Sequence, residues 1–234
     1  GNFARYMILL ARTSTEGARK YDGLSFFLAP MTVDGIEPRP IRKITGEYGF
    51  TETFFTDARI PADCLMGEEG QGWAIAMQTL QYERGAEAGA AGGLMSVRTG
   101  MGDFLDAIQD LRRDGEPVLS DPVVRDRLVQ LLMEEKAITL GDKRLGVPAL
   151  NTDYPFSLAL SSKLRTSEYS REMRKFAIEL QGAHGGLYVG DDDAVARGFW
   201  QRAYLNNFSM TIGGGTSQIQ ANIVGERVLG LPKD

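Results

Sequence analysis

Short apolar segments separated by polar or glycine-containing turns fill the first quarter of the chain, and longer segments with helical periodicity fill the rest. The short segments are rich in branched and aromatic residues, a composition typical of β-strands. Four such strands predict a small antiparallel sheet or part of a barrel, with open edges and little core of its own. We therefore interpret this region as the second half of a β domain. The predicted strands are residues 6–11, 24–29, 36–41 and 51–56.

From about residue 70, apolar residues recur at steps of three and four, which predicts helices with one buried face. The pattern predicts helices from about residue 70, over 154–181 and over about 194–209, while Asp121 and Pro122 supply the N-cap and first residue of another. Residues 112–120 are expected to form a loop. Helices with short connections predict an up-and-down bundle. The residues expected to face inward are Leu94, Val97, Met101, Leu105, Ile108, Val124, Leu128, Leu131, Leu132, Ile138, Leu160, Leu164, Tyr169, Met173, Phe176 and Leu180.

The fold class predicted from these two regions is therefore α+β, a partial antiparallel β domain followed by an all-α up-and-down helical bundle. Gly85, Gly89, Gly93 and Gly100 form a small-residue series in the first predicted helix. Each costs roughly 1 kcal/mol relative to alanine in a helix. Close packing of another helix is the commoner explanation for such a series, and close approach of a ligand is the alternative.

Composition narrows the classes of function. The chain has 234 residues, 43% of them hydrophobic and 24% charged, with a net charge of −5, which is typical of a globular protein and does not favour a general nucleic-acid surface. The single cysteine, Cys64, excludes an internal disulfide, and with the single histidine, His184, it makes a zinc site improbable. No apolar run reaches the roughly 20 residues of a membrane span. We expect a cytoplasmic location and no metal.

The most informative segment is TIGGGTSQIQ at residues 211–220. Its three glycines allow a backbone to approach another group closely, because no Cβ intervenes. Ser217 and Gln220 have the spacing of a capping box. A glycine loop that leads into a helix N-terminus suits a phosphate or another oxyanion, and an ordinary glycine turn with an N-cap is the alternative.

Several motifs resemble the acyl-CoA dehydrogenase family. GTSQIQ at 215–220 and VLGLP at 228–232 resemble its C-terminal signature, while LSFFLAP at 24–30, FFTDARIP at 54–61 and GEEGQGW at 67–73 resemble its middle β domain and the start of its helical domain. The resemblance implies that residues 1–68 are the C-terminal part of the middle β domain and that residues 69–234 are the C-terminal helical bundle domain. The family's N-terminal helical domain and early β-strands have no counterpart in this sequence.

Two substitutions within these motifs compensate each other. Many members carry the catalytic glutamate directly before GTSQIQ, where this chain has Gly214. Isovaleryl- and long-chain-type enzymes instead carry the glutamate on the first long helix and a glycine here, which matches Glu83 in LQYERG at 80–85. The resemblance thus implies that Glu83 abstracts the α-proton of an acyl-CoA and that the Gly214 N–H stabilises the developing enolate. Apart from this pairing, a solvated helix glutamate is the commoner state.

Other sites follow from the same resemblance. Arg84 and Gln81 are the expected substrate-binding residues. Thr216, Ser217 and Gln218 match positions that contact the ribityl-diphosphate portion of FAD. Glu179 and Gly182, in AIELQGAHG at 177–185, fall in a further cofactor segment, where Glu179 replaces a glutamine that reaches the FAD adenine of a neighbouring subunit. The family's R-x-x-F-G motif is not found, and residues 112–115 offer only a loose substitute. His184 is expected to be a loop or helix-end residue rather than a catalyst.

The resemblance implies FAD-dependent dehydrogenation of an acyl-CoA to a trans-2-enoyl-CoA, with electrons passed to an electron-transfer flavoprotein. It also implies a homodimer or homotetramer, or a heteromer with a homologue. Two alternatives remain open: a flavin oxidase relative of the same fold, and a non-catalytic subunit of a heteromeric dehydrogenase.

Overall fold

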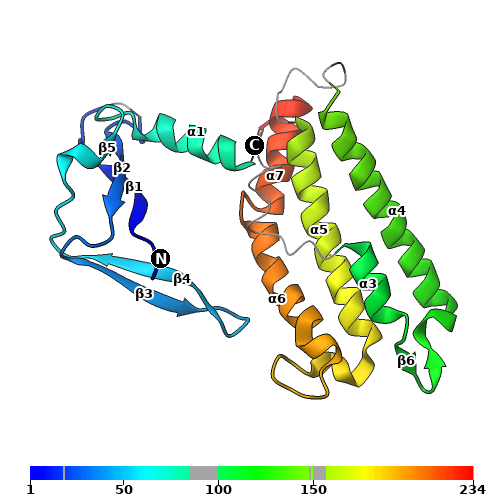
Figure 1. Ribbon diagram of the computed structural model, residues 1–234. Coiled ribbons are helices and arrows are strands. Elements are labelled where there is room, and N and C mark those ends of the chain that lie inside the picture. Colours follow the sequence, from blue (N-terminus) through cyan, green and yellow to red (C-terminus); the bar gives the residue numbers. More distant parts are fainter. Residues whose placement is uncertain (18, 85–99, 148, 150–156, 234) are drawn as a thin grey trace. The chain divides into compact units, whose positions relative to one another are not determined.

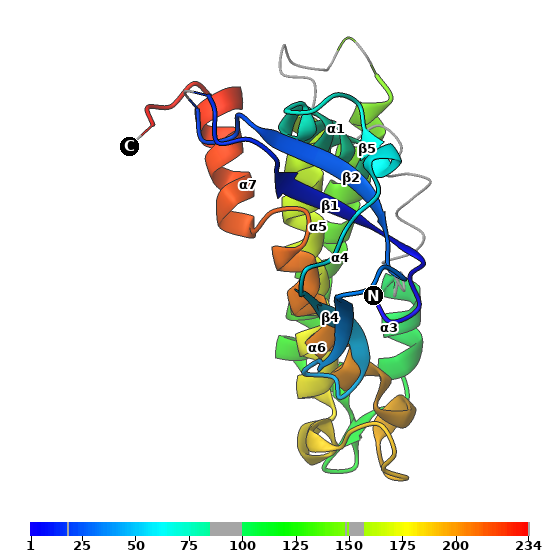
Figure 2. The ribbon, with the colours of Figure 1, turned by 90° about the vertical axis from the view of Figure 1, so that its left-hand side faces the viewer.

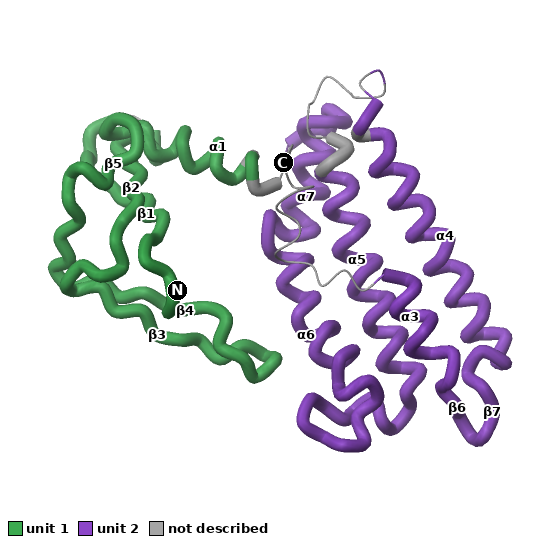
Figure 3. The backbone as a smooth tube through the Cα atoms, in the orientation of Figure 1, with its two compact units in different colours: residues 1–88 green, residues 89–234 purple. Residues whose placement is uncertain are grey.

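The computed structural model describes residues 1–17, 19–84, 100–147, 149 and 157–233. Two compact units are present, residues 1–88 and residues 89–234 (Figure 3). The first is built on strands and one helix, and the second is mainly helical, in agreement with the predicted α+β class. Helix α1 belongs to the first unit, and the family-based boundary at residues 68 and 69 stays a prediction.

The first unit contains two antiparallel sheets (Figures 1 and 2). In one, the strand order is β1-β2-β5, and β1 and β2 pair along their full length, with Tyr6 opposite Pro30 and Arg12 opposite Leu24. The other is the β3–β4 hairpin. All four predicted strands are confirmed, and the fourth begins three residues earlier than expected. Their bounds are β1 Tyr6–Arg12, β2 Leu24–Pro30, β3 Ile36–Arg42, β4 Tyr48–Phe55 and β5 Leu65–Met66, with a short 3-10 helix η1 over Ala62–Cys64.

Helix α1, Gly72–Arg84, is packed directly against β2. A Cβ on Gly72 would lie only 2.5–2.7 Å from the backbone of Ser25 and Leu24, so the helix can begin here only with glycine. Next to this contact, the Gly70 N–H donates to Ser25 Oγ at 3.0 Å. The Tyr21 and Trp73 rings stack at 3.9 Å between centroids. The β-sheet thus fixes the start of α1 within its own unit.

The second unit is a helical bundle in which α5 contacts α3, α4, α6 and α7 (Figure 1). Helix α4 begins with Asp121 as N-cap, whose side chain accepts from the Val123 N–H at 2.8 Å, as the sequence predicts. The main helices are α3 Met101–Ile108, α4 Pro122–Leu145, α5 Ser157–Leu180, α6 Phe199–Ile212 and α7 Ser217–Ile223. Shorter helices are η2 Val118–Ser120, η4 Gly182–Gly186, η5 Val195–Gly198 and the π-helix η6 Val224–Val228.

The bundle core centres on Phe104 of α3, which has no exposed surface. Its ring lies 5.9 Å from that of Phe176 on α5 and 5.8 Å from that of Trp200 on α6. Leu132, predicted to face inward, is instead 37% exposed, so that prediction is wrong. The predictions for Leu94 and Val97, and for three of the four glycines in the series, fall outside the described residues. Predicted positions that the structure buries are Met101, Ile108, Val124, Leu131, Ile138, Leu160, Met173, Phe176 and Leu180.

Residues 112–120, expected to be a loop, instead begin with a β-hairpin whose strands have two residues each. Strand β6, Arg112–Arg113, pairs with β7, Glu116–Pro117. Asp114 and Gly115 both have positive φ, 53° and 86°, as a type I′ turn requires. The Asp-Gly dipeptide was the sequence signal for this turn.

Among the helices that the structure describes, none combines the length and the apolar character that a membrane span requires.

Candidate functional site

The glycine loop predicted from the sequence joins α6 to α7. Its first residue, Gly213, donates its N–H to Ser209 O at 2.7 Å and so closes α6. Gly214 and Gly215 then adopt φ of 68° and 102°. A Cβ on Gly215 would lie 2.5 Å from Gln220 Nε2. Glycine is therefore required at residue 215 both by its backbone conformation and by the space available.

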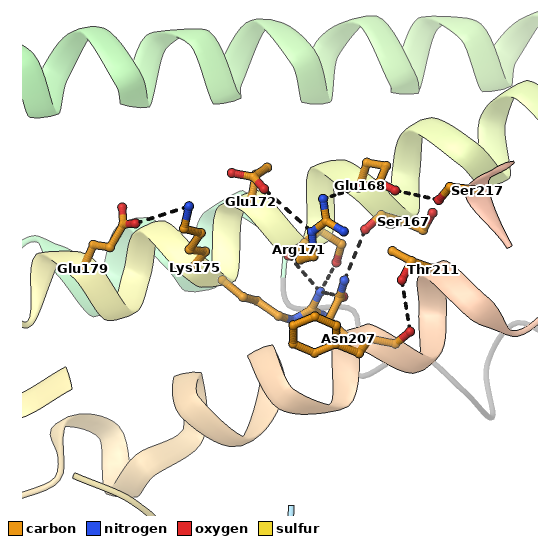
Figure 4. Close-up of polar contacts among 12 residues, drawn as sticks. Ser167, Glu168, Arg171, Glu172, Lys175, Glu179, Asn207, Thr211 and Ser217 are labelled. Carbon is orange, nitrogen blue, oxygen red and sulfur yellow. Dashed lines mark hydrogen bonds and ion pairs between the residues drawn. The ribbon is translucent and has the colours of Figure 1, made fainter. Parts of the chain in front are cut away.

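The N-cap of α7 is Thr216, so the predicted capping role of Ser217 is wrong. Thr216 Oγ1 accepts from the Ile219 N–H at 3.2 Å, and its backbone is extended with ψ of 159°. Ser217 already lies within the helix, and its hydroxyl is hydrogen-bonded to Glu168 Oε1 at 2.6 Å (Figure 4). The carboxylate can only accept, so Ser217 donates its one hydroxyl proton to Glu168. The proton of the Thr216 hydroxyl is not used by the cap.

Two carbonyls of the loop are held by side chains from two different helices. Gln220 Nε2 of α7 donates to Gly214 O at 2.6 Å, and Lys163 Nζ of α5 donates to Gly215 O at 2.7 Å. The chain contains no cis peptide among its described residues. In a trans peptide the N–H points away from the carbonyl of the same plane. The N–H groups of Gly215 and Thr216 are consequently directed away from Gln220 and Lys163.

Glu168 belongs to a row of charged side chains along α5 (Figure 4). Its carboxylate pairs with Arg171 at 2.5 Å, and Arg171 lies 3.7 Å from Glu172. These groups are each about a third to a half exposed, so the pairs contribute little to stability by themselves. Their main effect is to hold the Glu168 carboxylate in place for Ser217.

A second polar network connects α5 to α6 in the interior. Asn207 Nδ2 donates to Ser167 O at 3.2 Å, while Asn207 Oδ1 accepts from Arg174 at 2.5 Å (Figure 4). Arg174 also donates to Ser170. Burial lowers the pKa of the Arg174 guanidinium, because desolvation disfavours its charge. This network fixes the helix pair from which the glycine loop emerges.

The predicted cofactor residues Glu179 and Gly182 lie at the opposite end of α5 from the loop. Glu179 lies eleven positions after Glu168, which corresponds to roughly 16 Å along a helix. The Glu179 carboxylate pairs with Arg127 of α4 and lies 3.7 Å from Lys175. Gly182 begins η4 with φ of 58°, and His184, in the same turn, is exposed. Within this chain, Glu179 and Gly182 are thus not brought to the glycine loop.

The remaining predicted site residues lie in the first unit. Gln81, Glu83 and Arg84 occupy the last turn of α1, and their side chains lie outside the described part of the chain. The structure brings Gly214, Thr216, Ser217 and the exposed Gln218 together on one loop. It does not place them relative to Glu83.

The glycine loop presents hydrogen-bond donors from which an oxyanion could accept. Gly214 and Gly215 carry no side chains of their own, and Thr216 offers a hydroxyl proton next to directed N–H groups. Donors of this kind suit phosphate oxygens. Among the described residues, no group of three or more His, Cys, Asp or Glu side chains could hold a metal ion.

Sequence reasoning missed Lys163 and Glu168 as supports of the loop. Both lie on the predicted helix over 154–181, but they reach residues about 50 positions later in the chain. A lysine and a glutamate on a helix are usually solvated. No pattern in a single sequence links such distant positions.

Comparisons with known proteins agree on one family. A family model described as the C-terminal domain of acyl-CoA dehydrogenase matches residues 70–229. The chain is 34% identical over 234 residues to the acyl-CoA dehydrogenase IpdE1 of Mycolicibacterium smegmatis, covering 100% of the chain and 55% of that protein. It is 33% identical over 230 residues to the acyl-CoA dehydrogenase FadE34 of Mycobacterium tuberculosis, covering 98% of the chain and 29% of that protein.

Solved structures show the same fold. The Tcur3481-Tcur3483 steroid ACAD matches with a TM-score of 0.82 at 26% identity, covering 100% of this chain and 58% of that one. The ChsE4-ChsE5 complex from Mycobacterium tuberculosis matches with a TM-score of 0.80 at 24% identity, covering 100% of this chain and 59% of that one. The second likeness concerns the fold alone. The chain thus spans little more than half the length of these two structures.

Proposed function

The chain belongs to the acyl-CoA dehydrogenase family, and on this premise we propose that its protein converts an acyl-CoA thioester to a trans-2-enoyl-CoA with FAD as cofactor. The observation that carries the proposal is the glycine loop, in which Gln220 and Lys163 hold two backbone carbonyls and the Thr216 hydroxyl retains its proton. When bound, FAD supplies the acceptor for the hydride that leaves the substrate Cβ, and an electron-transfer flavoprotein is the proposed onward acceptor.

Glu83 is the proposed base. Abstraction of a proton α to a thioester requires a carboxylate held against the Cα–H and shielded from water. Glu83 is in the last turn of α1, whose start is fixed on β2 by Gly72. A rigid helix anchored at its other end is a suitable support for such a group.

Gly214 is the proposed backbone donor to the thioester oxygen. Charge that develops on this oxygen in the transition state is stabilised best by a donor that is already oriented. Both neighbouring peptide planes of the loop are anchored, one at Ser209 O and the other at Gln220. Arg84 and Gln81, adjacent to Glu83 on α1, are proposed to position the acyl-CoA.

Thr216, Ser217 and Gln218 are the proposed contacts to the ribityl-diphosphate portion of FAD. Because Ser217 donates its hydroxyl proton to Glu168, we assign the hydroxyl donor to Thr216 and only a backbone contact to Ser217. Glu179 and Gly182 are proposed cofactor contacts across a subunit boundary in a homodimer or homotetramer. We also propose a cytoplasmic location, where a free thiol such as that of Cys64 stays reduced.

A second candidate function is that of a subunit paired with a homologous partner. The residue at position 179 favours this candidate. The family resemblance leads us to expect a glutamine here, whose amide reaches the FAD of a neighbouring subunit, but this chain has Glu179, whose carboxylate is paired with Arg127. Glu83 favours an active subunit instead. In a heteromer, Glu83 would serve one kind of active site and the partner would complete the FAD contacts.

The proposal is tested on the full-length protein, purified in its native assembly. We expect noncovalently bound FAD, released by denaturation and identified by chromatography, and an enoyl-CoA product when acyl-CoAs are incubated with an artificial electron acceptor. A series of acyl-CoAs of different length and branching identifies the substrate class. A protein that retains no flavin, even when co-purified with its homologous partner, would refute the proposal.

A further inference from the structure

Gln220 is the most deeply buried polar side chain of the glycine-loop region. It is only 1% exposed, although it lies on a short helix next to the loop. Its Nε2 donates to Gly214 O at 2.6 Å, and its Oε1 has no partner among the described residues. The bond to Gly214 is therefore the one hydrogen bond that the described structure gives to this amide.

A buried amide with one unsatisfied atom is costly, by about 1–3 kcal/mol. Here the cost is linked to a specific backbone arrangement. Gly215 could not carry a side chain without meeting Gln220 Nε2 at 2.5 Å, so the loop closes tightly over the amide. Loop and side chain consequently fix each other.

The bond from Gln220 also restricts the orientation of the Gly214 N–H. This group belongs to the peptide plane between residues 213 and 214. The plane before it is anchored by the Gly213 N–H bond to Ser209 O at 2.7 Å, and the plane after it by the bond from Gln220 to Gly214 O. Three consecutive glycines have little conformational preference of their own. Without Gln220, only the first of these two anchors would remain.

We propose that Gln220 is a positioning residue that orients the Gly214 N–H toward the thioester oxygen by holding the Gly214 carbonyl. The inference rests on the proposed function, in which this N–H stabilises the developing enolate. Since the donor acts mainly on charge that appears in the transition state, Gln220 governs the rate of the chemical step more than substrate affinity. It contacts no reacting atom itself.

Gln220→Leu keeps the approximate shape and removes the hydrogen bond. In the full-length holoprotein, we expect flavin reduction by acyl-CoA to slow about 10- to 100-fold, since deleting an oxyanion donor outright costs roughly 100- to 1,000-fold. The Kd for acyl-CoA should change little. In the FAD-free protein, amide hydrogen exchange of residues 213–217 should become faster, which reports on the loop independently of activity. Asn222→Leu, which removes an exposed amide from the same helix, should leave both quantities unchanged.

Gln220→Glu tests the same bond by pH. When protonated, the introduced carboxyl can donate to Gly214 O, and when ionised it repels that oxygen. Burial raises the pKa of such a group. The rate of flavin reduction relative to wild type should therefore be nearly restored at low pH and fall as the pH rises. A variant of this kind also decides the matter if Gln220→Leu does not fold.

The outcomes are distinguishable. Faster exchange with unchanged reduction rate would overturn the inference and leave the proposed function intact, as would a pH-independent Gln220→Glu. Unchanged exchange in Gln220→Leu would also overturn it. A wild-type protein whose flavin no acyl-CoA reduces would overturn the proposed function, and with it the assignment of the Gly214 N–H.

Discussion

Thr216 and Ser217 are adjacent hydroxyl residues, and the structure predicts a large loss of FAD affinity when the Thr216 hydroxyl is removed and a small loss when the Ser217 hydroxyl is removed. The Ser217 hydroxyl donates to Glu168, whereas the Thr216 hydroxyl accepts from the Ile219 N–H and keeps its proton. A hydrogen bond to a charged acceptor such as a phosphate contributes about 1.5–3 kcal/mol. Thr216→Val should therefore weaken FAD binding by roughly 10- to 150-fold.

Ser217→Ala should have a much smaller effect. It breaks a contact to a carboxylate that is 35% exposed, and it reaches the cofactor only through the loop. We expect a loss below about 1 kcal/mol, or roughly fivefold in affinity. Glu168→Ala should match Ser217→Ala, and the double variant should be no worse than either one.

FAD dissociation constants of the full-length protein, measured by flavin fluorescence after reconstitution, test this prediction. Thr216→Ser retains both roles of the hydroxyl and should bind FAD nearly as well as wild type. Asp121→Ala removes a different N-cap, that of α4, and so controls for helix destabilisation alone. If Ser217→Ala weakened FAD binding as much as Thr216→Val, the assignment of the hydroxyl donor would be refuted.

Three further predictions concern the bundle and the loop. Phe104→Ala removes a fully buried ring packed on Phe176 and Trp200. It should destabilise the helical unit by about 3–5 kcal/mol, measured as a lower thermal midpoint, and a change below about 1 kcal/mol would contradict the core assignment. Gly215→Ala should lower the free energy of unfolding by about 1–3 kcal/mol, because alanine is strained at a φ of 102° and its Cβ collides with Gln220. The control, Gly102→Ala, lies in open space on α3 and should be neutral or stabilising by up to about 1 kcal/mol. Equal thermal midpoints for the two variants would argue against the loop geometry. Asn207→Leu should destabilise the helical unit by about 2–4 kcal/mol, because it removes a hydrogen-bond partner of buried Arg174. The control Asn206→Leu, on the same helix, should leave its stability nearly unchanged. Similar losses of stability in both variants would contradict a buried network.

Much of the fold could be predicted because it follows local rules. The four long strands combine branched and aromatic residues with turns, and Asp121-Pro122 supplies the N-cap and the first residue that a helix start favours. The hairpin at residues 112–117 was also readable, since an Asp-Gly pair at positive φ is its usual turn. It was overlooked because its strands are only two residues long.

Other features depend on tertiary contacts that no local pattern encodes. Ser217 and Thr216 both have the chemistry of an N-cap, and the choice between them is decided by Glu168, 49 residues earlier in the chain. Leu132 fits the helical period but lies on the exposed side of α4. The pairing of Glu83 with Gly214 came from family resemblance and stays a prediction.

Anaerobic titration of the full-length flavoprotein with acyl-CoA tests the central claim most directly, with the visible absorbance of oxidised flavin as readout. The account predicts bleaching in the wild type and in Glu69→Gln, an exposed glutamate ahead of α1. In Glu83→Gln it predicts retained FAD, retained acyl-CoA binding and reduction slowed by roughly 100- to 10,000-fold, the usual contribution of a general base. Bleaching of Glu83→Gln at the wild-type rate would show that another group removes the proton.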